Sequence, residues 1–323
     1  MTLKALITGS TGFIGSHLVE ALTEKNWDVS CLIRPKSRPG ILSQFPARIV
    51  QGDVDDIPSL EEAVQNQDYV FHVAARIRSA PKTIYNMANV RFTVNLAQAC
   101  LNVNPGLKRF VFISSIAAAG PSLSGTCSDE ACVCAPASEY GRTKLRAENA
   151  LCCLWDQLPT TIIRPPNVYG PRQLETELLT NIIKKRIVPL LKDETGRTSL
   201  IYIEDLVNGI IQAALSSRTA GQIYYLTDGI NHSWKNIILT NKDQILGTSL
   251  FFPLPEKLIF LAAWLADMLN TTGLYKVLFG RRILKVMLQT PWLFSPAKAE
   301  RDFGFKSRYS LQEGMKKTLN YHK

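Results

Sequence analysis

The chain has 323 residues, 46% of them hydrophobic, and carries a formal net charge of +10 at pH 7. This length allows one large hydrophobic core, and glycine and proline are too few to indicate disorder. No long apolar run follows a basic start, so we predict no signal peptide and expect a cytoplasmic protein. The seven cysteines have no regular spacing, and we predict neither a disulfide framework nor a metal site.

The positive charge is concentrated near the C-terminus, where basic and apolar residues alternate irregularly. Basic and aromatic residues are not interleaved as in nucleic-acid-binding proteins, so we expect no nucleic-acid partner. Residues 256–288 include the most apolar predicted helix, whose uncharged core, 258–266, is far shorter than the roughly 20 residues of a membrane span. Three alternatives remain for this segment: core packing, a lid over an apolar substrate, or a weak peripheral membrane contact.

Short apolar runs alternate with amphipathic stretches through the first half of the chain. We predict strands at residues 4–8, 29–33, 47–51, 68–74, 109–115 and 160–164. Helices are predicted at residues 14–24, 60–65 and 83–101, and from residue 138. This alternation predicts an α/β fold, a Rossmann-type doubly wound parallel sheet. We expect residues 1–165 to form an NAD(P)-binding domain to which 198–216 return, and 166–323 to form a smaller, mostly helical substrate-binding part.

A glycine-rich turn, "TGSTGFIGSHL", follows the first predicted strand and opens a helix, with glycines at Gly9, Gly12 and Gly15. Free backbone N–H groups and the helix dipole at such a turn favour the pyrophosphate of a dinucleotide. Glycine is required there for the turn itself and for close approach of the backbone to the ligand. We therefore predict a dinucleotide site, to which Thr11, Phe13 and Ile14 also belong.

The second predicted strand runs into "CLIRPKSR", which offers Arg34 and no acidic residue. An acid at this place would accept a hydrogen bond from the adenosine ribose, whereas an arginine accommodates a 2′-phosphate. We therefore favour NADP(H) as the cofactor, with NAD(H) as the alternative. Asp53, in "GDVDD" after the third strand, is placed to meet the adenine together with Val54.

The segment "SEYGRTKLRAE" places Tyr140 and Lys144 four residues apart, on one face of a predicted helix. A tyrosine beside a fixed positive charge loses its proton more easily than its reference pKa of about 10 allows. The pair can also be an ordinary feature of a helix surface. Its position after a glycine turn and five predicted strands favours an acid held beside the charge that tunes it.

These motifs, together with "NVRFTVNLAQA", "RPPNVYGPR" and "IYIEDLV", resemble the extended short-chain dehydrogenase/reductase family, also described as the NAD-dependent epimerase/dehydratase family. The resemblance covers nearly the whole chain and is nearest to the branch of 3β-hydroxysteroid dehydrogenases and dihydroflavonol reductases. It implies that Tyr140 is the general acid/base and that Lys144 binds the nicotinamide ribose and lowers the tyrosine pKa. It also implies a homodimer, formed through the helices around Asn89 and Tyr140.

The resemblance further implies a serine that holds the substrate oxygen, for which Ser114 and Ser115 compete. Counting back five residues from Gly120 selects Ser115. Ser114 is then expected near the cofactor, with the remaining family positions Ala74, Ala75, Asn89, Pro166 and Val168.

Three reaction classes share this apparatus. A dehydratase would carry acids just after the serine, where this chain has Ile116 and Ala117. A nucleoside-diphosphate-sugar epimerase with tightly bound NAD would have an arginine in place of Thr198, although Asn167 and Arg172 suit a sugar substrate. We therefore predict an oxidoreductase that reduces a ketone or oxidises a secondary alcohol on a mostly apolar small molecule. A sensor that binds NADP(H) without turnover is a further alternative.

Overall fold

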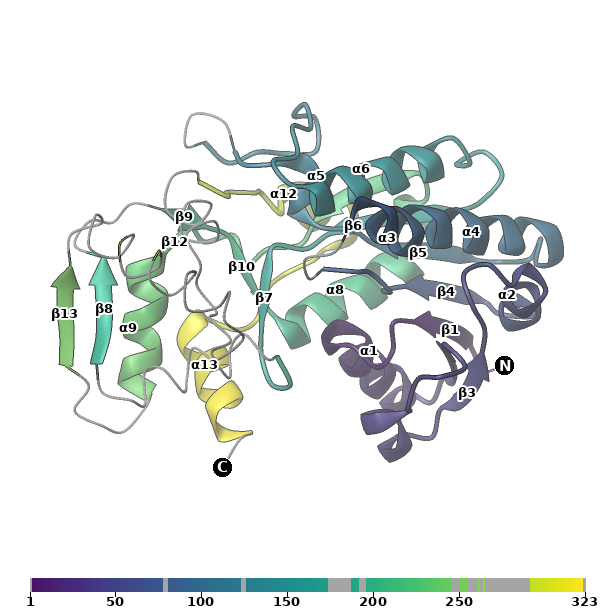
Figure 1. The fold of residues 1–323 in the computed structure, drawn as a ribbon, viewed down its shortest axis with the longest axis horizontal. Coiled ribbons are helices and arrows are strands. Elements are labelled where there is room, and N and C mark those ends of the chain that lie inside the picture. The colour runs from purple at the N-terminus through teal and green to yellow at the C-terminus, as the bar shows by residue number, and fades with distance from the viewer. Residues whose placement is uncertain are drawn as a thin grey trace.

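The computed structural model describes residues 2–77, 81–122, 126–173, 187–191, 196–244, 250–254, 261, 264 and 291–321. Within them lies a seven-stranded sheet in the order β11-β6-β5-β4-β1-β2-β3, and every neighbouring pair is parallel (Figure 1). Its strands are β1 Lys4–Thr8, β2 Asp28–Ile33, β3 Arg48–Gln51, β4 Tyr69–His72, β5 Arg109–Ile113, β6 Thr160–Arg164 and β11 Gln222–Tyr225. The order reverses between β1 and β4, which is where such sheets bind their ligands.

Helices cover both faces of the sheet, as the alternation of elements predicts. One face is covered by α1 Phe13–Glu24 and α8 Ile203–Leu215. The other is covered by α2 Ile57–Val64, α4 Phe92–Val103 and α6 Glu139–Cys152. The shorter helical elements of this part are η1 Gly40–Gln44, α3 Lys82–Asn86, α5 Ile116–Ala119 and η4 Ser217–Thr219, and a π-helical turn, η2, at Met87–Arg91 joins α3 to α4. The Rossmann-type fold is thus confirmed.

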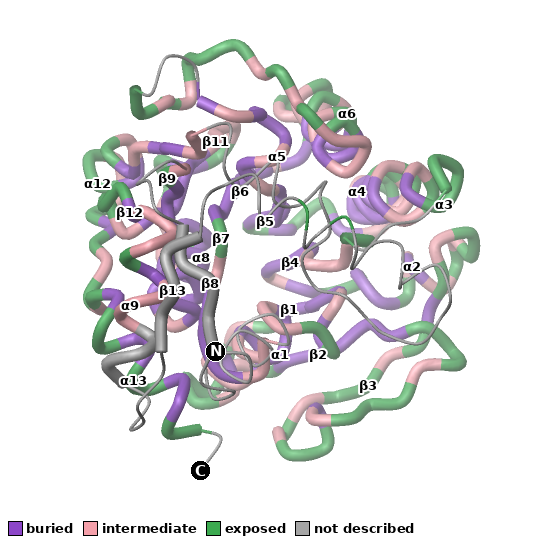
Figure 2. Tube along the Cα trace, turned by 60° about the vertical axis from the view of Figure 1, so that its left-hand side comes forward, coloured by how far each residue is buried: buried purple, intermediate pink, exposed green. Residues whose placement is uncertain are grey.

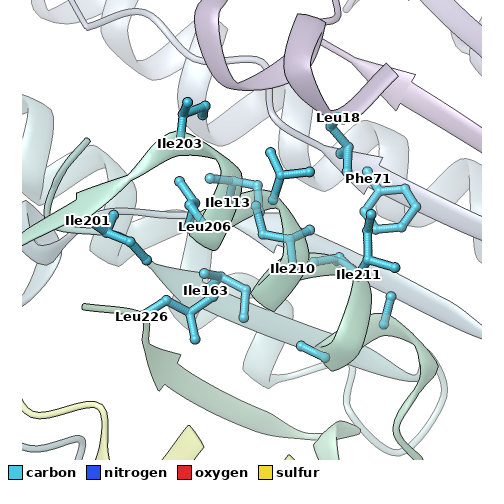
Figure 3. Packing of buried hydrophobic residues seen from close by; sticks show 14 of the residues in the cluster. Leu18, Phe71, Ile113, Ile163, Ile201, Ile203, Leu206, Ile210, Ile211 and Leu226 are labelled. Atoms are coloured by element: carbon cyan, nitrogen blue, oxygen red, sulfur yellow. The ribbon is translucent and has the colours of Figure 1, made fainter. Parts of the chain in front are cut away.

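The strands are apolar on both sides because both faces of the sheet are buried. In β1, Ala5 and Ile7 belong to the cluster beneath α1 and α8, whereas Leu6 belongs to the cluster beneath α2, α4 and α6. Figure 3 shows the first cluster, in which Leu206 and Ile210 of α8 pack over the sheet. The buried trace runs through these central strands, and the exposed residues lie on the outer helices and loops (Figure 2).

The C-terminal part combines helices with short strand pairs. Its described elements are β7 Asn167–Tyr169, β8 Ile187–Leu191, β9 Arg197–Thr198, β10 Leu200–Tyr202, β12 His232–Ser233, α9 Trp234–Gln244, β13 Leu250–Leu254, α12 Ala297–Phe303 and α13 Leu311–Asn320. We expect residues 198–216 to return to the first domain. The strand β10 pairs with β7 outside the seven-stranded sheet, while α8 packs on β5 and β6, and the seventh strand is β11.

Among the described residues no helix is long and apolar enough to span a membrane. The predicted membrane-contact segment, 256–288, lies outside the described residues except for Leu261 and Trp264. Among all the residues that the structure describes, no group of three or more His, Cys, Asp or Glu side chains could hold a metal ion.

Asp205 ties the end of the chain to the first turn of α8. Its buried carboxylate accepts hydrogen bonds from the Ser307 hydroxyl at 2.8 Å and from the backbone N–H groups of Arg308 and Tyr309, both at 3.0 Å. These residues lead into α13, so one carboxylate fixes the position at which the C-terminal helix begins.

We expect Asp205→Asn to lower the free energy of unfolding by about 2–4 kcal/mol, because the three hydrogen bonds lose their charged acceptor and the new amide NH2 is buried where Oδ1 has no partner. The measurement is chemical denaturation followed by circular dichroism. The matched control is Asp55→Asn, whose carboxylate pairs with Arg91 on the exposed surface and is expected to contribute about 1 kcal/mol or less. Equal losses in the two variants would contradict the anchoring role of Asp205.

Candidate active site

The glycine turn between β1 and α1 is built by two close backbone approaches. Gly9 has φ +69°, and a Cβ on it would lie 2.6 Å from the backbone nitrogen of Ala74, which follows β4. A Cβ on Gly15 would lie 2.2 Å from the Gly9 carbonyl oxygen. Neither position accepts a side chain, so the turn is pressed against the ends of β1 and β4 at the reversal point of the sheet.

The first turn of α1 is suited to an anion. Gly12 is the N-cap residue, no side chain caps the helix, and its first turn carries no acid. Thr11 and Gly12 are exposed, and Phe13 and Ile14 are partly so. Unsatisfied N–H groups at a bare helix N-terminus attract phosphate groups, so the predicted pyrophosphate site fits the residues present.

The predicted adenosine contacts end neighbouring strands of the same sheet. Arg34 directly follows β2, and its side chain is exposed. Asp53 is also exposed and follows β3, while the carbonyl of Val54 accepts a hydrogen bond from Asn95 at 2.7 Å. Two strand ends therefore present a cation and a carboxylate beside the glycine turn.

The structure brings Ser115 and Tyr140 together. Ser115 caps α5, where its hydroxyl accepts from the Ala117 N–H at 3.1 Å, and it lies close enough to the Tyr140 hydroxyl to oppose the rise in the pKa of that group. A Cβ on Gly141 would lie 2.1 Å from the Ala117 carbonyl oxygen, so α6 lies directly on α5. The glycine after the tyrosine thus permits the contact that places the phenol at the serine.

Lys144 lies one turn further along α6 and is fully buried. Its ammonium group donates to the carbonyl of Ile113, the last residue of β5, at 2.7 Å and lies 4.3 Å from the centre of the Phe112 ring. Burial lowers the pKa of Lys144 to about 7, although the negative charge of Glu148 opposes this shift. The lysine is therefore held at the end of the same strand that carries Ser115.

The predicted lowering of the tyrosine pKa is not seen in this structure. Burial raises the pKa of Tyr140 to about 12, and the nearby Ser115 side chain opposes only part of the rise. Lys144 does not reverse this shift. Its ammonium group donates to the Ile113 carbonyl, and burial favours the neutral form of the amine. The phenol is consequently protonated at neutral pH.

Asn89, which we expect near the cofactor, makes its described contacts within the protein. Its side chain is completely buried in the π-helical turn, where its amide oxygen accepts from the Arg76 N–H at 2.7 Å. Its amide nitrogen donates to the Arg76 carbonyl and to the Thr143 hydroxyl, both at 3.1 Å. Asn89 thus ties the loop after β4, which contains Ala74 and Ala75, to α6, and its side chain supports the cofactor site from behind.

The serine next to the catalytic candidate also has a structural partner. The Ser114 hydroxyl is buried and donates to Glu148, and its backbone N–H donates to the Ile163 carbonyl at 2.7 Å, so neither donor is left for the predicted cofactor contact. Pro166 is buried just before β7, and Val168 lies within β7, half-buried beside β10.

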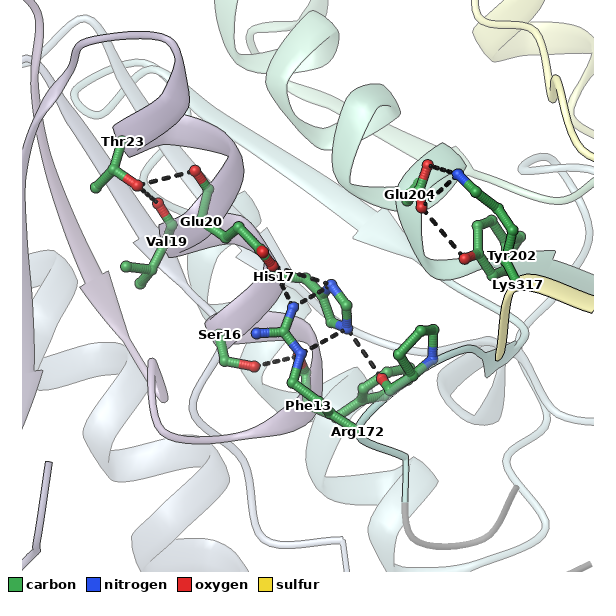
Figure 4. A network of polar contacts seen from close by, with 11 residues as sticks. Phe13, Ser16, His17, Val19, Glu20, Thr23, Arg172, Tyr202, Glu204 and Lys317 are labelled. Carbon is green, nitrogen blue, oxygen red and sulfur yellow. Dashed lines mark hydrogen bonds and ion pairs between the residues drawn. The ribbon is translucent and has the colours of Figure 1, made fainter. Parts of the chain in front are cut away.

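The two predicted substrate residues are separated. The Asn167 amide is exposed and donates to the Thr198 hydroxyl at 2.9 Å, so it remains a substrate candidate. Arg172 instead extends onto α1, where its guanidinium is bonded to His17 and paired with Glu20 (Figure 4). A substrate phosphate would have to displace Glu20, which argues against the predicted role of Arg172.

Sequence reasoning missed one buried pair beneath the site. Glu148 of α6 and Arg164 at the end of β6 are 1% and 3% exposed and form a bidentate ion pair, with a shortest distance of 2.6 Å. The available signal was the position of Glu148, four residues after Lys144 on the buried side of the helix.

With this geometry established, the comparisons with known proteins define the class. Residues 5–226 match the model of the NAD dependent epimerase/dehydratase family, and the chain belongs to that family. It is 28% identical to a UDP-glucose 4-epimerase of Vibrio cholerae, with 98% of this chain and 95% of the relative covered. It is 25% identical to a ceramide reductase of Caulobacter vibrioides, with 98% and 93% covered.

Among solved structures, the chain resembles a UDP-glucuronic acid 4-epimerase from Bacillus cereus in complex with UDP-glucuronic acid and NAD. The TM-score is 0.76 at 22% identity, and the alignment covers 99% of this chain and 98% of the other. This likeness supports the fold seen in the described residues.

The bare N-terminus of α1 leads to a test with the dinucleotide alone. In Gly12→Ala, the new Cβ would meet only the Gly9 carbonyl oxygen, at 3.2 Å, so we expect the fold to lose about 1 kcal/mol or less. The methyl group would stand where the pyrophosphate approaches, and we expect the affinity for the coenzyme to fall at least about tenfold, or 1.4 kcal/mol. Isothermal titration calorimetry measures this. Gly106→Ala, a change into open space, is the control and should bind as the wild type does.

Proposed function

We propose that this protein is an NAD-dependent 4-epimerase of a diphosphate-linked sugar. The observation that carries the proposal is the meeting of the Ser115 and Tyr140 hydroxyls beside Lys144, at the edge of the sheet where the bare helix N-terminus lies. This arrangement suits hydride chemistry at a secondary alcohol. The full-length similarity to the UDP-glucose 4-epimerase of Vibrio cholerae supports the choice of a sugar.

The bound coenzyme would supply a hydride acceptor that can return the hydride. The protein would supply the proton chemistry. Tyr140, once its phenol has lost its own proton, would take the proton from the sugar hydroxyl as a ketone forms and would give it back as the alcohol is restored. Ser115 would hydrogen-bond the same oxygen and fix its direction. Since inversion requires reduction from the opposite face, the sugar must turn within the site while the coenzyme stays bound.

This proposal reverses our preference between the two leading readings of the sequence. A reductase of an apolar ketone is kept as the second candidate because two observations favour it. The chain is similar over its whole length to a ceramide reductase. In addition, the arginine expected of a nucleoside-diphosphate-sugar epimerase is replaced by the buried Thr198, and the neighbouring Arg197 is exposed, on the other side of β9.

The family description supports NAD(H) as the coenzyme, and the preference for NADP(H) that we based on Arg34 has no support in the comparisons. A homodimer remains part of the proposal. In its support, three large apolar side chains of α3, η2 and α4, Ile84, Met87 and Val94, are exposed at helical spacing, which is the kind of stripe a helix partner covers. The cytoplasmic location also stays a prediction.

The substrate class is tested by following UDP-glucose and coenzyme together. We expect the wild type to convert UDP-glucose to its 4-epimer, seen by NMR of the anomeric proton, without net change in NADH absorbance. In Tyr140→Phe the proton carrier is removed, and the rate should fall by about 10²–10⁴-fold while coenzyme is still bound. Tyr69→Phe, a buried tyrosine of β4, is the control and should keep the wild-type rate.

Other outcomes favour the alternatives. Net consumption of NADH or NADPH with apolar ketones, and no epimer, would establish the reductase instead. Coenzyme binding without turnover of either kind of substrate would favour the sensor.

The choice of coenzyme is tested at Arg34. We expect the wild type to bind NADH at least as tightly as NADPH, and Arg34→Ser to change the NADH affinity by less than about threefold, since the arginine has no 2′-phosphate to hold. Fluorescence titration with both coenzymes measures this. Tighter NADPH binding in the wild type, lost in Arg34→Ser, would restore the NADP(H) preference. Arg38→Ser, a change in the same exposed loop, controls for a general effect of charge.

A further inference from the structure

One face of α6 reaches the end of β5 through three successive turns. Tyr140 contacts Ser115, Lys144 donates to the Ile113 carbonyl, and the Glu148 carboxylate accepts from the Ser114 hydroxyl. The first two contacts belong to the reaction described above. The third does not, because Glu148 is buried and cannot reach a substrate.

The Glu148 carboxylate is held firmly from the neighbouring strand. Arg164 donates from Nε to both carboxylate oxygens, at 3.0 and 3.2 Å, and from Nη2 to one of them at 2.6 Å. The rest of the guanidinium is also engaged, by the Tyr225 hydroxyl at 2.9 Å and the Cys134 sulfur at 3.3 Å. A buried charge pair is costly to desolvate, so its presence directly beneath the active site calls for a role beyond stability.

We propose that Glu148, clamped by Arg164, is a positioning residue for the catalytic groups: it holds Ser114, and so the turn that presents Ser115, and it places a carboxylate one helical turn from Lys144. The inference concerns the site of the proposed function, but its first test needs no substrate.

The protonation of Lys144 depends on every titratable or charged group that surrounds it. The titratable and charged groups on the elements packed around it are Tyr140 and Glu148 on α6, Tyr85 on α3, His72 on β4, Arg164 on β6, Tyr225 on β11 and Cys134 in the loop before α6. Burial lowers the pKa of His72 to about 3, raises that of Tyr140 to about 12 and raises that of Tyr225. These three are neutral near pH 7, which leaves Glu148 as the carboxylate and Arg164 as its counter-charge.

Removing the negative charge and removing its positive partner should then shift the pKa of Lys144 in opposite directions. Glu148→Gln removes the negative charge that favours the ammonium form, so Lys144 should lose its proton at a pH lower by about one unit. Arg164→Gln leaves Glu148 with Lys144 as its neighbouring cation, so Lys144 should lose its proton at a higher pH. Ser114→Ala removes the hydrogen bond but no charge, and should leave the titration where it is.

The readout is a pH titration of the lysine side-chain nitrogen by ¹⁵N NMR in the full-length protein, with the Lys144 signal assigned from Lys144→Arg. Shifts of opposite sign in the two charge variants support the proposal. An unchanged titration in Glu148→Gln, with only a lower melting temperature, would overturn it and leave the pair a purely structural element. If both single variants fail to fold, the double variant, which leaves no unpaired charge, replaces them and should titrate below the wild type.

The pH profile of turnover provides a second readout. If the ammonium form is the active one, the rate falls as Lys144 loses its proton, so the alkaline limb of the profile should move to lower pH in Glu148→Gln and to higher pH in Arg164→Gln. Ser114→Ala should lower the rate without moving the limb, because Ser115 is less well placed. Absence of turnover in the wild type would count against the proposed function and would leave the NMR test of the lysine intact.

Discussion

The close approach of α6 to α5, the short helix that follows β5, is the contact on which the candidate active site depends. Gly141 lies so near Ala117 that no side chain fits between them, and this short distance determines how close the other residues on that face of α6 lie to α5 and the end of β5. A helix repeats its face every three to four residues, so one correct contact places the next two turns as well. The positions of the Tyr140 phenol, the Lys144 ammonium group and the Glu148 carboxylate therefore all depend on the contact between α6 and α5.

The electrostatics of the site follow from the same burial. A desolvated phenol keeps its proton and a desolvated amine tends to lose it, and the shifts of Tyr140 and Lys144 have these signs. The structure therefore holds a protonated phenol beside a lysine that is easily deprotonated, a state suited to giving a proton to an oxygen. Taking a proton from a substrate hydroxyl requires the phenolate, which a fully protonated Lys144 would stabilise. The groups around Lys144 influence how much of it is protonated.

Much of this could be predicted from the sequence, because the first six strands and their helices follow simple apolar patterns and the glycine turn has a spacing of its own. Ser115, Tyr140 and Lys144 were found from local motifs that the fold brings together. The features that the sequence could not predict depend on contacts between distant segments. The partners of Arg172 and Asn89 come from other elements, and the pairing of β10 with β7 depends on how the chain turns after Gly170. The pKa of Tyr140 depends on burial, which no spacing of residues reveals.

The sheet is completed late in the chain. Its outermost strand, β11, and one of the helices that cover it, α8, come after the first segments of the C-terminal part. Ile113 and Ile163 are packed beneath α8, so a fragment that ends at residue 165 would expose them to water (Figure 3). During synthesis the coenzyme-binding half therefore cannot reach its final form on leaving the ribosome; it must wait until about sixty further residues have emerged. Residues 1–165 and the later segments that complete the sheet are therefore expected to fold as one unit.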